Sequence, residues 1–222
     1  DGPIGLAVSG GSDSLALLVL TVDWAKKCGR SVFVVTLDHG LREEAANEAE
    51  GVAKICAGLG VSHDTLRWDG HHKGNTQDAA RRVRQRLIGD WAKTHDLVAV
   101  ATGHTRDDQA ETFLLRLKRG SGVDGLSGMA RCIEKDGVLW VRPLLHKRRD
   151  ALRATLKDRG VAWFDDPSNG DNRYDRVKVR KALKIIQEVG ISIDLLANTA
   201  ERLQTTRAAL EQLTLDVAHV VA

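Results

Sequence analysis

The sequence predicts an α/β fold, in which helices cover both faces of a parallel, twisted sheet and a helical extension follows. Four apolar, β-like runs alternate with segments whose apolar residues recur every three to four positions. Strict alternation of strand and helix implies a parallel sheet that is buried on both faces. A glycine-rich turn follows the first run, where folds of this kind bind ligands beyond the carboxyl ends of their strands.

The expected elements follow from this periodicity. The strands are expected at residues 4–9, 31–37, 61–68 and 97–102, and the helices between and after them at 15–27, 43–59, 76–95 and 105–118. A glycine-rich loop at 120–128 precedes a further strand at 139–144, and later helices are expected at 147–159, 175–188 and 194–218. The sequence offers no other segment against which the last helix would pack. We therefore predict a main domain at 1–185 and a helical linker or extension at 186–222.

Composition limits the class of protein. The chain has 222 residues, of which 42% are hydrophobic and 28% charged, as in a soluble protein with one good core. No apolar run is long enough to cross a membrane and no signal peptide precedes the first strand, so no membrane partner is expected. The three cysteines, Cys28, Cys56 and Cys132, form no Cys-x-x-Cys pair. A reduced, cytoplasmic setting is expected.

Charge is distributed unevenly along the chain. Between Arg142 and Lys184 there are thirteen Lys and Arg residues against six Asp and Glu, although the net charge of the whole chain is only +3. Such an asymmetry is typical of a surface that meets a polyanion. The alternative is an ordinary solvated helix surface.

The turn after the first strand has the features of a phosphate site. Glycines leave the backbone N–H groups exposed there, and the positive end of the following helix points at the same place. An aspartate inside such a loop suits Mg²⁺ bound to a pyrophosphate, whereas the lysine of a Walker A loop is missing. The alternative is a plain turn with Ser12 as the N-cap. The nucleotide-binding residues predicted here are Ser9, Gly10, Gly11, Ser12, Asp13 and Ser14.

Two further strand ends are expected to meet this turn in one cleft. After the second strand, Asp38, His39 and Arg42 offer backbone for a base edge and a guanidinium for a phosphate, or else they only form a turn. After the fourth strand comes Gly103, and then His104, Asp108 and Glu111 at spacings i, i+4 and i+7, which predicts one helix face. The alternative is a surface i,i+4 pair. Carboxylates gathered in one cleft require a cation or a substrate ammonium between them.

A basic helix follows the turn Asp166-Pro167-Ser168-Asn169. Arg176 and Arg180 are four residues apart, so they lie on one face of that helix. Paired guanidinium groups suit a phosphate or a developing phosphoryl charge. The alternative is again a solvated basic helix.

Together these motifs resemble a known family. Ser-Gly-Gly-Ser-Asp-Ser at 9–14 resembles the signature loop of the N-type ATP pyrophosphatases of the PP-loop superfamily. Joint occurrence with the motifs at 37–42, 103–112, 119–129, 142–145 and 166–169 looks like the tRNA(Ile)-lysidine synthetase family. The resemblance extends from Ile4 to about Arg180. It implies a Rossmann-like sheet of the adenine nucleotide alpha hydrolase type.

The resemblance also implies a reaction. ATP and Mg²⁺ would adenylylate the wobble cytidine in the CAU anticodon of tRNA(Ile), and L-lysine would then replace AMP at C2 to give lysidine. The residues carried over to catalysis are Asp13, His104, Asp108, Glu111 and Arg176. In this scheme Asp13 holds the metal, Arg176 neutralises phosphoryl charge, Asp108 accepts a proton and Glu111 anchors the lysine ammonium. His104 binds phosphate or orients Asp108.

Long members of that family carry C-terminal tRNA-binding domains, so this sequence is expected to be a short or truncated form. The last helix is expected to pair with its copy in a homodimer or to pack on a further domain. Two other functions stay open. One is a tRNA-thiolating ATP pyrophosphatase, although the three cysteines are not paired in sequence, and the other is a module that binds ATP without turnover.

Overall fold

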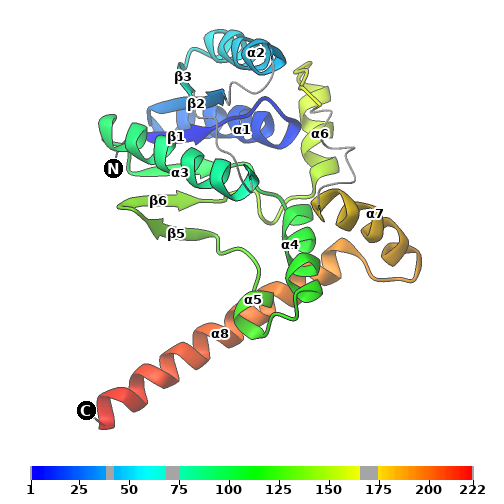
Figure 1. The fold of residues 1–222 in the computed structure, drawn as a ribbon. Coiled ribbons are helices and arrows are strands. Elements are labelled where there is room, and N and C mark those ends of the chain that lie inside the picture. Colours follow the sequence, from blue (N-terminus) through cyan, green and yellow to red (C-terminus); the bar gives the residue numbers. More distant parts are fainter. Residues whose placement is uncertain (1, 39–42, 69–75, 166–174, 222) are drawn as a thin grey trace. The chain divides into compact units, whose positions relative to one another are not determined.

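The computed structural model describes residues 2–38, 43–68, 76–165 and 175–221 (Figure 1). The chain forms two compact units. The first comprises Asp1–His104, Arg131–Leu144 and Arg149–Asp165, and the second comprises Thr105–Ala130, Leu145–Arg148 and Asp166–Ala222. The boundary predicted at residue 185 lies inside the second unit, and that division into domains stays a prediction.

The first unit is built on one six-stranded sheet with the order β3-β2-β1-β4-β6-β5. All neighbours pair in parallel except β5 and β6, which are antiparallel. The predicted α/β fold with a mostly parallel sheet is confirmed. The strands are β1 (Ile4–Ala7), β2 (Val32–Asp38), β3 (Ser62–Arg67), β4 (Ala99–Thr102), β5 (Cys132–Lys135) and β6 (Val138–Val141).

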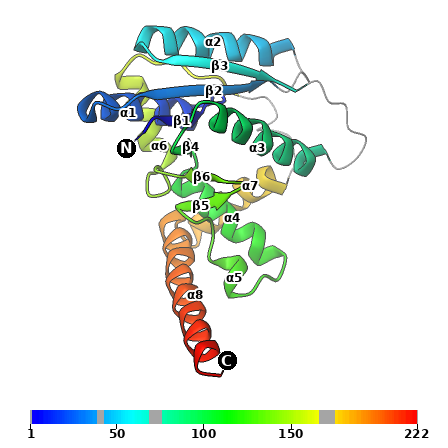
Figure 2. The ribbon, with the colours of Figure 1, turned by 90° about the vertical axis from the view of Figure 1, so that its left-hand side faces the viewer.

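Both faces of this sheet are buried under helices. Alternate residues of β2 enter different clusters: Val32 and Val34 pack with α1 (Ser12–Cys28), α2 (Glu43–Leu59) and α6 (Arg149–Asp158). Phe33 and Val35 pack on the opposite side with α3 (Thr76–Thr94), and Figure 2 shows α1 and α3 on opposite sides of the strands. Because side chains alternate across a strand, two covered faces require the continuous apolar runs that the sequence contains.

The order of the strands fixes where a ligand can bind. From β1 the chain proceeds to β2 and β3 on one side of the sheet, and β4 then pairs with the other side of β1. Ala7 at the end of β1 is in register with Val35 of β2 and with Thr102 of β4. The connections after β1 and β4 therefore leave the same edge of the sheet at its topological switch point, which is the usual place for a ligand crevice.

Two elements differ from the prediction. The segment before β6 contains an additional strand, β5, and the two strands are joined by Asp136 and Gly137, both with positive φ (55° and 73°). Positive φ at both central residues is the signature of a type I′ hairpin turn, for which Asp-Gly is a preferred sequence. The loop predicted at 120–128 contains a single helical turn, α5 (Val123–Leu126).

The second unit is helical. The elements α4 (Arg106–Lys118), α7 (Asp175–Glu188) and α8 (Ile193–Val221) share a core that includes Ala110, Phe113, Leu183 and Ala200. The later part of α8 extends beyond α4 and α5 (Figure 1). It exposes leucines such as Leu213. The helical extension is confirmed, and homodimer formation through it stays a prediction. Within the described ranges, every helix is too short or too polar to span a bilayer.

A half-buried histidine, His63, predicts how the stability of the first unit depends on pH. The ring nitrogen Nε2 of His63 lies 2.9 Å from Thr36 Oγ1, and burial lowers the pKa of His63, although Asp64 opposes this shift. The unfolded chain therefore binds a proton more readily than the folded chain. The contribution of neutral His63 is complete above the ordinary pKa of about 6.5 and is lost as pH falls through and below that value.

We expect the thermal unfolding midpoint to fall less between pH 7.5 and pH 5.5 in His63→Gln than in the unchanged protein, measured by circular dichroism. His219→Gln, on an exposed part of α8, should retain the original slope. Equal slopes in all three proteins would contradict the prediction.

Candidate functional site

The phosphate loop joins β1 to α1 with an uncapped helix start. Helix α1 begins at Ser12, and its N-cap is Gly11, which is extended (φ −72°, ψ 160°) and makes no side-chain capping bond. The alternative that Ser12 serves as the N-cap is therefore wrong. Since no side chain caps this helix, the N–H groups of its first turn suit an anion. Gly10 has φ 84°, in the region that glycine adopts without strain.

Two serines hold the shape of this loop. The Ser14 hydroxyl donates to the carbonyl oxygen of Gly11 at 2.9 Å and accepts from the backbone N–H of Ser9 at 3.1 Å. The Ser9 and Ser14 hydroxyl oxygens lie 3.3 Å apart. These contacts close the turn on itself. The sequence predicted both serines as nucleotide contacts, and the structure gives them this additional task.

An aromatic residue supports the loop from the segment after α6. The N–H of Phe164 donates to the carbonyl oxygen of Gly10 at 3.0 Å. A Cβ atom on Gly10 would lie 3.0 Å from the Phe164 ring, and one on Gly51 of α2 would lie only 2.4 Å from it. The ring thus packs on two glycines. Sequence reasoning missed Phe164, because nothing local connects it to a turn that precedes it by more than 150 residues.

Gly103 brings the end of β4 against the first turn of α1. A Cβ atom at this position would lie 2.9 Å from the carbonyl oxygen of Asp13 and 3.0 Å from Cα of Ser14. Backbone atoms cannot yield as a flexible side chain does, so only glycine fits here. The predicted convergence of the first and fourth strand ends is confirmed for this pair of segments within the first unit.

His104 does not lie on the predicted helix face. Helix α4 begins at Arg106 with Thr105 as its N-cap, so His104 precedes the helix and the i, i+4, i+7 pattern is wrong for it. Its Nδ1 instead lies 2.9 Å from Thr102 Oγ1 at the end of β4. The helix begins later than the pattern implied, because the side chain of Thr105 caps it and Arg106 is its first residue.

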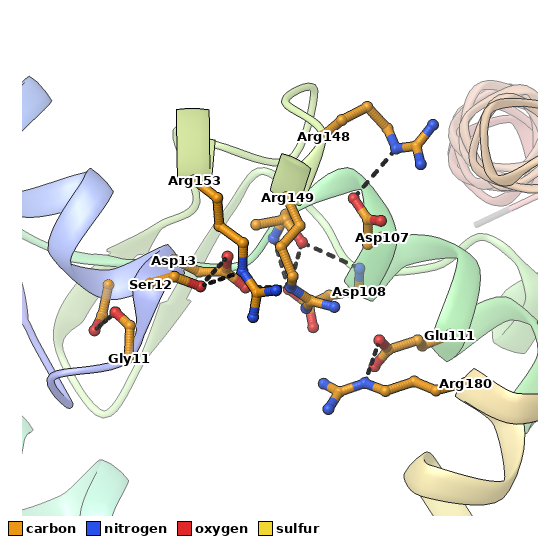
Figure 3. A network of polar contacts seen from close by, with 12 residues as sticks. Gly11, Ser12, Asp13, Asp107, Asp108, Glu111, Arg148, Arg149, Arg153 and Arg180 are labelled. Atoms are coloured by element: carbon orange, nitrogen blue, oxygen red, sulfur yellow. Dashed lines mark hydrogen bonds and ion pairs between the residues drawn. The ribbon is translucent and has the colours of Figure 1, made fainter. Parts of the chain in front are cut away.

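Two arginines from α6 reach the phosphate loop, and the sequence analysis assigned neither. Arg149 Nε donates to Asp13 Oδ2 at 2.7 Å, and Arg153 Nε donates to the hydroxyl of Ser12 at 3.2 Å (Figure 3). The Arg153 guanidinium also lies over the ring of Trp163 at 5.7 Å. The available signal was the i,i+4 spacing of two arginines inside the basic segment.

Asp108 has a local structural task in the second unit. Its Oδ2 accepts from the N–H and from the hydroxyl of Thr105, both at 2.8 Å, while Thr105 Oγ1 accepts from the N–H of Asp108. This reciprocal arrangement is a capping box at the start of α4. A substitution of Asp108 would remove this cap as well as any catalytic carboxylate, so an experiment has to distinguish the two effects.

Glu111 is the most deeply buried carboxylate among the described residues of the second unit, with 1% of its side chain exposed. Arg180 Nε donates to its Oε1 at 2.7 Å (Figure 3). Arg176 Nε lies 3.9 Å from Oε2. The two arginines predicted to share one face of α7 therefore both face this carboxylate. A buried carboxylate needs such partners, because an unpaired buried charge is costly.

Some predicted residues lie outside the described ranges. These are His39 and Arg42 after β2, together with the turn at 166–169. Asp38 is described as the last residue of β2, and its carbonyl oxygen accepts from the N–H of Trp68 at 3.0 Å. Asp108, Glu111 and Arg176 belong to the second unit, so their convergence with Asp13 stays a prediction.

Comparison with known proteins identifies the family of this chain. The sequence model of one protein family, the PP-loop domain, matches residues 1–188. The tRNA(Ile)-lysidine synthase of Ruegeria pomeroyi is 49% identical over 94% of this chain and 50% of its own length, and that of Rhodopseudomonas palustris is 48% identical over 94% and 61%. The enzyme of Hyphomonas neptunium is 45% identical over 93% and 57%. The chain thus spans between half and about three fifths of these curated relatives.

The chain therefore belongs to the PP-loop family, within the group of the tRNA(Ile)-lysidine synthases, as its motifs predicted. A solved structure titled U34-tRNA thiolase NcsA from Methanococcus maripaludis with its [4Fe-4S] cluster has a TM-score of 0.79 and 16% identity, over 91% of this chain and 72% of that one. NMN synthetase from Francisella tularensis has a TM-score of 0.53 and 12% identity, over 90% and 86%. At these identities the likeness shows the fold alone.

The tight approach at Gly103 generates a prediction. In Gly103→Ala the new methyl group meets backbone of α1, so the free energy of unfolding should fall by about 1–3 kcal/mol, as in overpacked cores. Chemical denaturation measures this. Gly58→Ala is the control, because an added Cβ there meets nothing within 4 Å in α2 and alanine is the better helix former. A Gly103→Ala protein as stable as the unchanged one would contradict the close contact.

The buried ion pair generates another prediction. Glu111→Gln leaves the Arg180 guanidinium without its carboxylate, and because that side chain is one third exposed we expect a loss of about 2 kcal/mol in unfolding free energy. Asp175→Asn is the matched control, since it removes an exposed pair with Lys118 between the same two helices, α4 and α7. Equal losses in the two variants would show that burial of Glu111 does not matter.

Proposed function

We propose that this chain is the catalytic part of a cytoplasmic enzyme that joins L-lysine to C2 of the wobble cytidine of CAU-anticodon tRNA(Ile) at the expense of ATP. The observation that carries the proposal is an intact phosphate loop, Ser9 to Ser14, at the switch point of the sheet in a chain with relatives called tRNA(Ile)-lysidine synthase. All three cysteines are free thiols, which supports a reducing compartment.

The loop fits ATP and Mg²⁺ in its chemistry. Gly10 and Gly11 leave the backbone bare at the uncapped start of α1, where a triphosphate can accept hydrogen bonds from N–H groups. Asp13, in the first turn of α1, offers hard carboxylate oxygens, and Mg²⁺ is usually held by one or two carboxylates together with substrate phosphates. The bound ion would neutralise phosphate charge as pyrophosphate leaves.

In the first step the cytidine O2 attacks the α-phosphorus of ATP, the bond to the β-phosphate breaks, and pyrophosphate departs. Cytidine O2 is otherwise a poor leaving group, so this step converts it into one. The protein has little covalent chemistry to perform here, and catalysis depends on positioning and charge. The backbone of residues 10–14 would orient the triphosphate, and Ser9 and Ser14 would keep that backbone in shape.

In the second step the lysine ε-amine attacks C2 and AMP leaves. An unperturbed amine has a pKa of about 10.4, so presenting it neutral at pH 7 costs roughly 4 to 5 kcal/mol. We assign Glu111 to anchor the ammonium and Asp108 to accept its proton. Because Glu111 is paired with Arg180, the lysine ammonium would either replace the Arg180 guanidinium at the Glu111 carboxylate or bind that carboxylate beside it. Arg176 would be available to neutralise phosphoryl charge.

Basic side chains on α7 support RNA binding. Lys178, Lys181 and Lys184 are exposed along this helix, and cations of this kind bind RNA phosphates without reading sequence.

His104, fixed by Thr102 at the end of β4, is proposed to bind phosphate. Cys56 is an unsuitable nucleophile for a thiolase, because burial raises the pKa of its thiol to about 11.

One assay tests the reaction. We expect release of pyrophosphate from ATP to require CAU-anticodon tRNA(Ile), and release of AMP to require lysine in addition, with lysine becoming attached to the RNA. Asp13→Asn should reduce the rate at least a hundredfold. Asp108→Asn should reduce lysine transfer more than pyrophosphate release, whereas Thr105→Ala, which removes the cap but keeps the carboxylate, should not reproduce that split. Turnover that needs a sulfur donor would favour the thiolase, and binding without turnover would favour the ATP-binding module.

Salt dependence tests the RNA surface. Each lost phosphate contact reduces the slope of log affinity against log salt by about 0.7 to 0.9. In the double variant Lys178→Gln, Lys184→Gln we therefore expect a slope smaller by about 1.5, measured by filter binding at several salt concentrations. The control is Lys26→Gln, Lys27→Gln in the last turn of α1, which removes the same charge from another surface. Equal slopes in the two double variants would contradict this role of α7.

A further inference from the structure

Helix α6 directs two arginines at the first turn of α1. Arg149 and Arg153 are four residues apart and so share a face of α6, and their Nε atoms contact Asp13 and Ser12, the second and first residues of α1 (Figure 3). Both helices belong to the first unit. The guanidinium groups therefore lie beside the positive end of the helix that carries the phosphate loop.

Positive charge gathers at the start of α1. Two guanidinium groups lie beside the partial positive charge of the helix start; the Asp13 carboxylate pairs with Arg149, and the Asp165 carboxylate, which is 77% exposed, lies 3.6 Å from Arg153. Cations are unfavourable near a helix N-terminus. A pair serving only to join α1 and α6 would not need this placement. The end of α6 is already tied to α1 elsewhere, since Arg159, the residue after α6, donates to Asp23 at 2.6 Å.

The pair between Arg149 and Asp13 also conflicts with metal binding by Asp13. Both side chains are less than one fifth exposed, and Oδ2 of Asp13 is engaged by Nε at 2.7 Å. A carboxylate oxygen that binds Mg²⁺ approaches it to about 2.0–2.1 Å. A divalent cation and a guanidinium on the same oxygen repel each other. Oδ2 of Asp13 therefore cannot keep its contact with Arg149 and bind the metal ion at the same time.

We propose that Arg149 exchanges partners when nucleotide binds: it holds the Asp13 carboxylate in the nucleotide-free protein and moves to a phosphate oxygen when Asp13 turns to Mg²⁺. The inference rests on the proposed binding of ATP at this loop and adds a residue to it. A guanidinium binds phosphate with charge-assisted hydrogen bonds, so the pair lost at Asp13 is replaced at the nucleotide. Arg153, stacked on Trp163, stays beside Ser12 as a fixed positive charge.

The exchange predicts different roles for the metal in different variants. In the unchanged protein, Mg²⁺ strengthens nucleotide binding because it occupies the carboxylate that Arg149 leaves. In Asp13→Asn, the ion pair between Arg149 and the Asp13 carboxylate is absent, so metal-free nucleotide should bind at least as tightly as to the unchanged protein, while Mg²⁺ should give no further gain. In Arg149→Gln, the phosphate contact is missing with or without metal.

Isothermal titration calorimetry tests this with an ATP analogue whose α and β phosphorus atoms are joined by a methylene group, with and without Mg²⁺. We expect Arg149→Gln to weaken binding of the magnesium complex at least tenfold and Arg149→Lys to give an intermediate value. Arg159→Gln is the matched control, because it removes an arginine–aspartate pair between the same two segments, away from the loop, and should stay within twofold. Thermal unfolding shows whether each variant is folded. If Arg149→Gln does not fold, Arg149→Lys is used for the test in its place.

The outcomes are distinct. Unchanged affinity in both Arg149 variants, or equal weakening in Arg149→Gln and Arg159→Gln, would overturn the exchange and leave Arg149 as a structural tie. Metal-free binding that weakens in Asp13→Asn would also overturn it, because the carboxylate would then not oppose the nucleotide. If the unchanged protein binds no analogue at all, the proposed function fails and the exchange fails with it.

Discussion

The candidate site depends on one close contact between two pieces of backbone. After β4 the chain passes so near to the first turn of α1 that a Cβ atom at residue 103 would lie 2.9 Å from the carbonyl oxygen of Asp13. Because β1 and β4 are parallel neighbours, their ends leave the same edge of the sheet, and glycine lets the two connections meet. This approach brings the segment that contains His104 beside the start of α1 and the loop Ser9 to Ser14.

Arginine pairing organises the carboxylates in both units. In the first unit Arg149 holds Asp13, and in the second unit Arg180 holds Glu111. Each pair is largely shielded from water, so each carboxylate is kept in one place before any substrate arrives. Such pairs contribute less to stability than their charge implies, since desolvation offsets much of the attraction. Their value for catalysis lies in partner exchange, because a lysine ammonium, a metal ion or a phosphate can replace one member of a pair without leaving a buried charge alone.

Much of this fold was predictable because its signals are local. Parallel strands buried on both faces appear as continuous apolar runs, and β1, β2 and β4 were found for that reason. The strand β5 was missed because it is short, exposed and polar at Glu134 and Lys135, so that only the Asp-Gly turn marked it. His104 was placed on a helix face because spacing alone cannot show that Thr105 caps the helix one residue later.

The sequence by itself determined the alternation of strand and helix, the glycine-rich turn at residues 9–14 and the resemblance to the PP-loop family, since each depends on residues close together in the chain. Only the tertiary structure decided which groups pair with the carboxylates, because Arg149 and Asp13 are 136 positions apart and Arg180 and Glu111 are 69 apart. Ion pairing has no sequence period. It is decided by which helix faces the sheet brings together, and that depends on the packing of the whole unit.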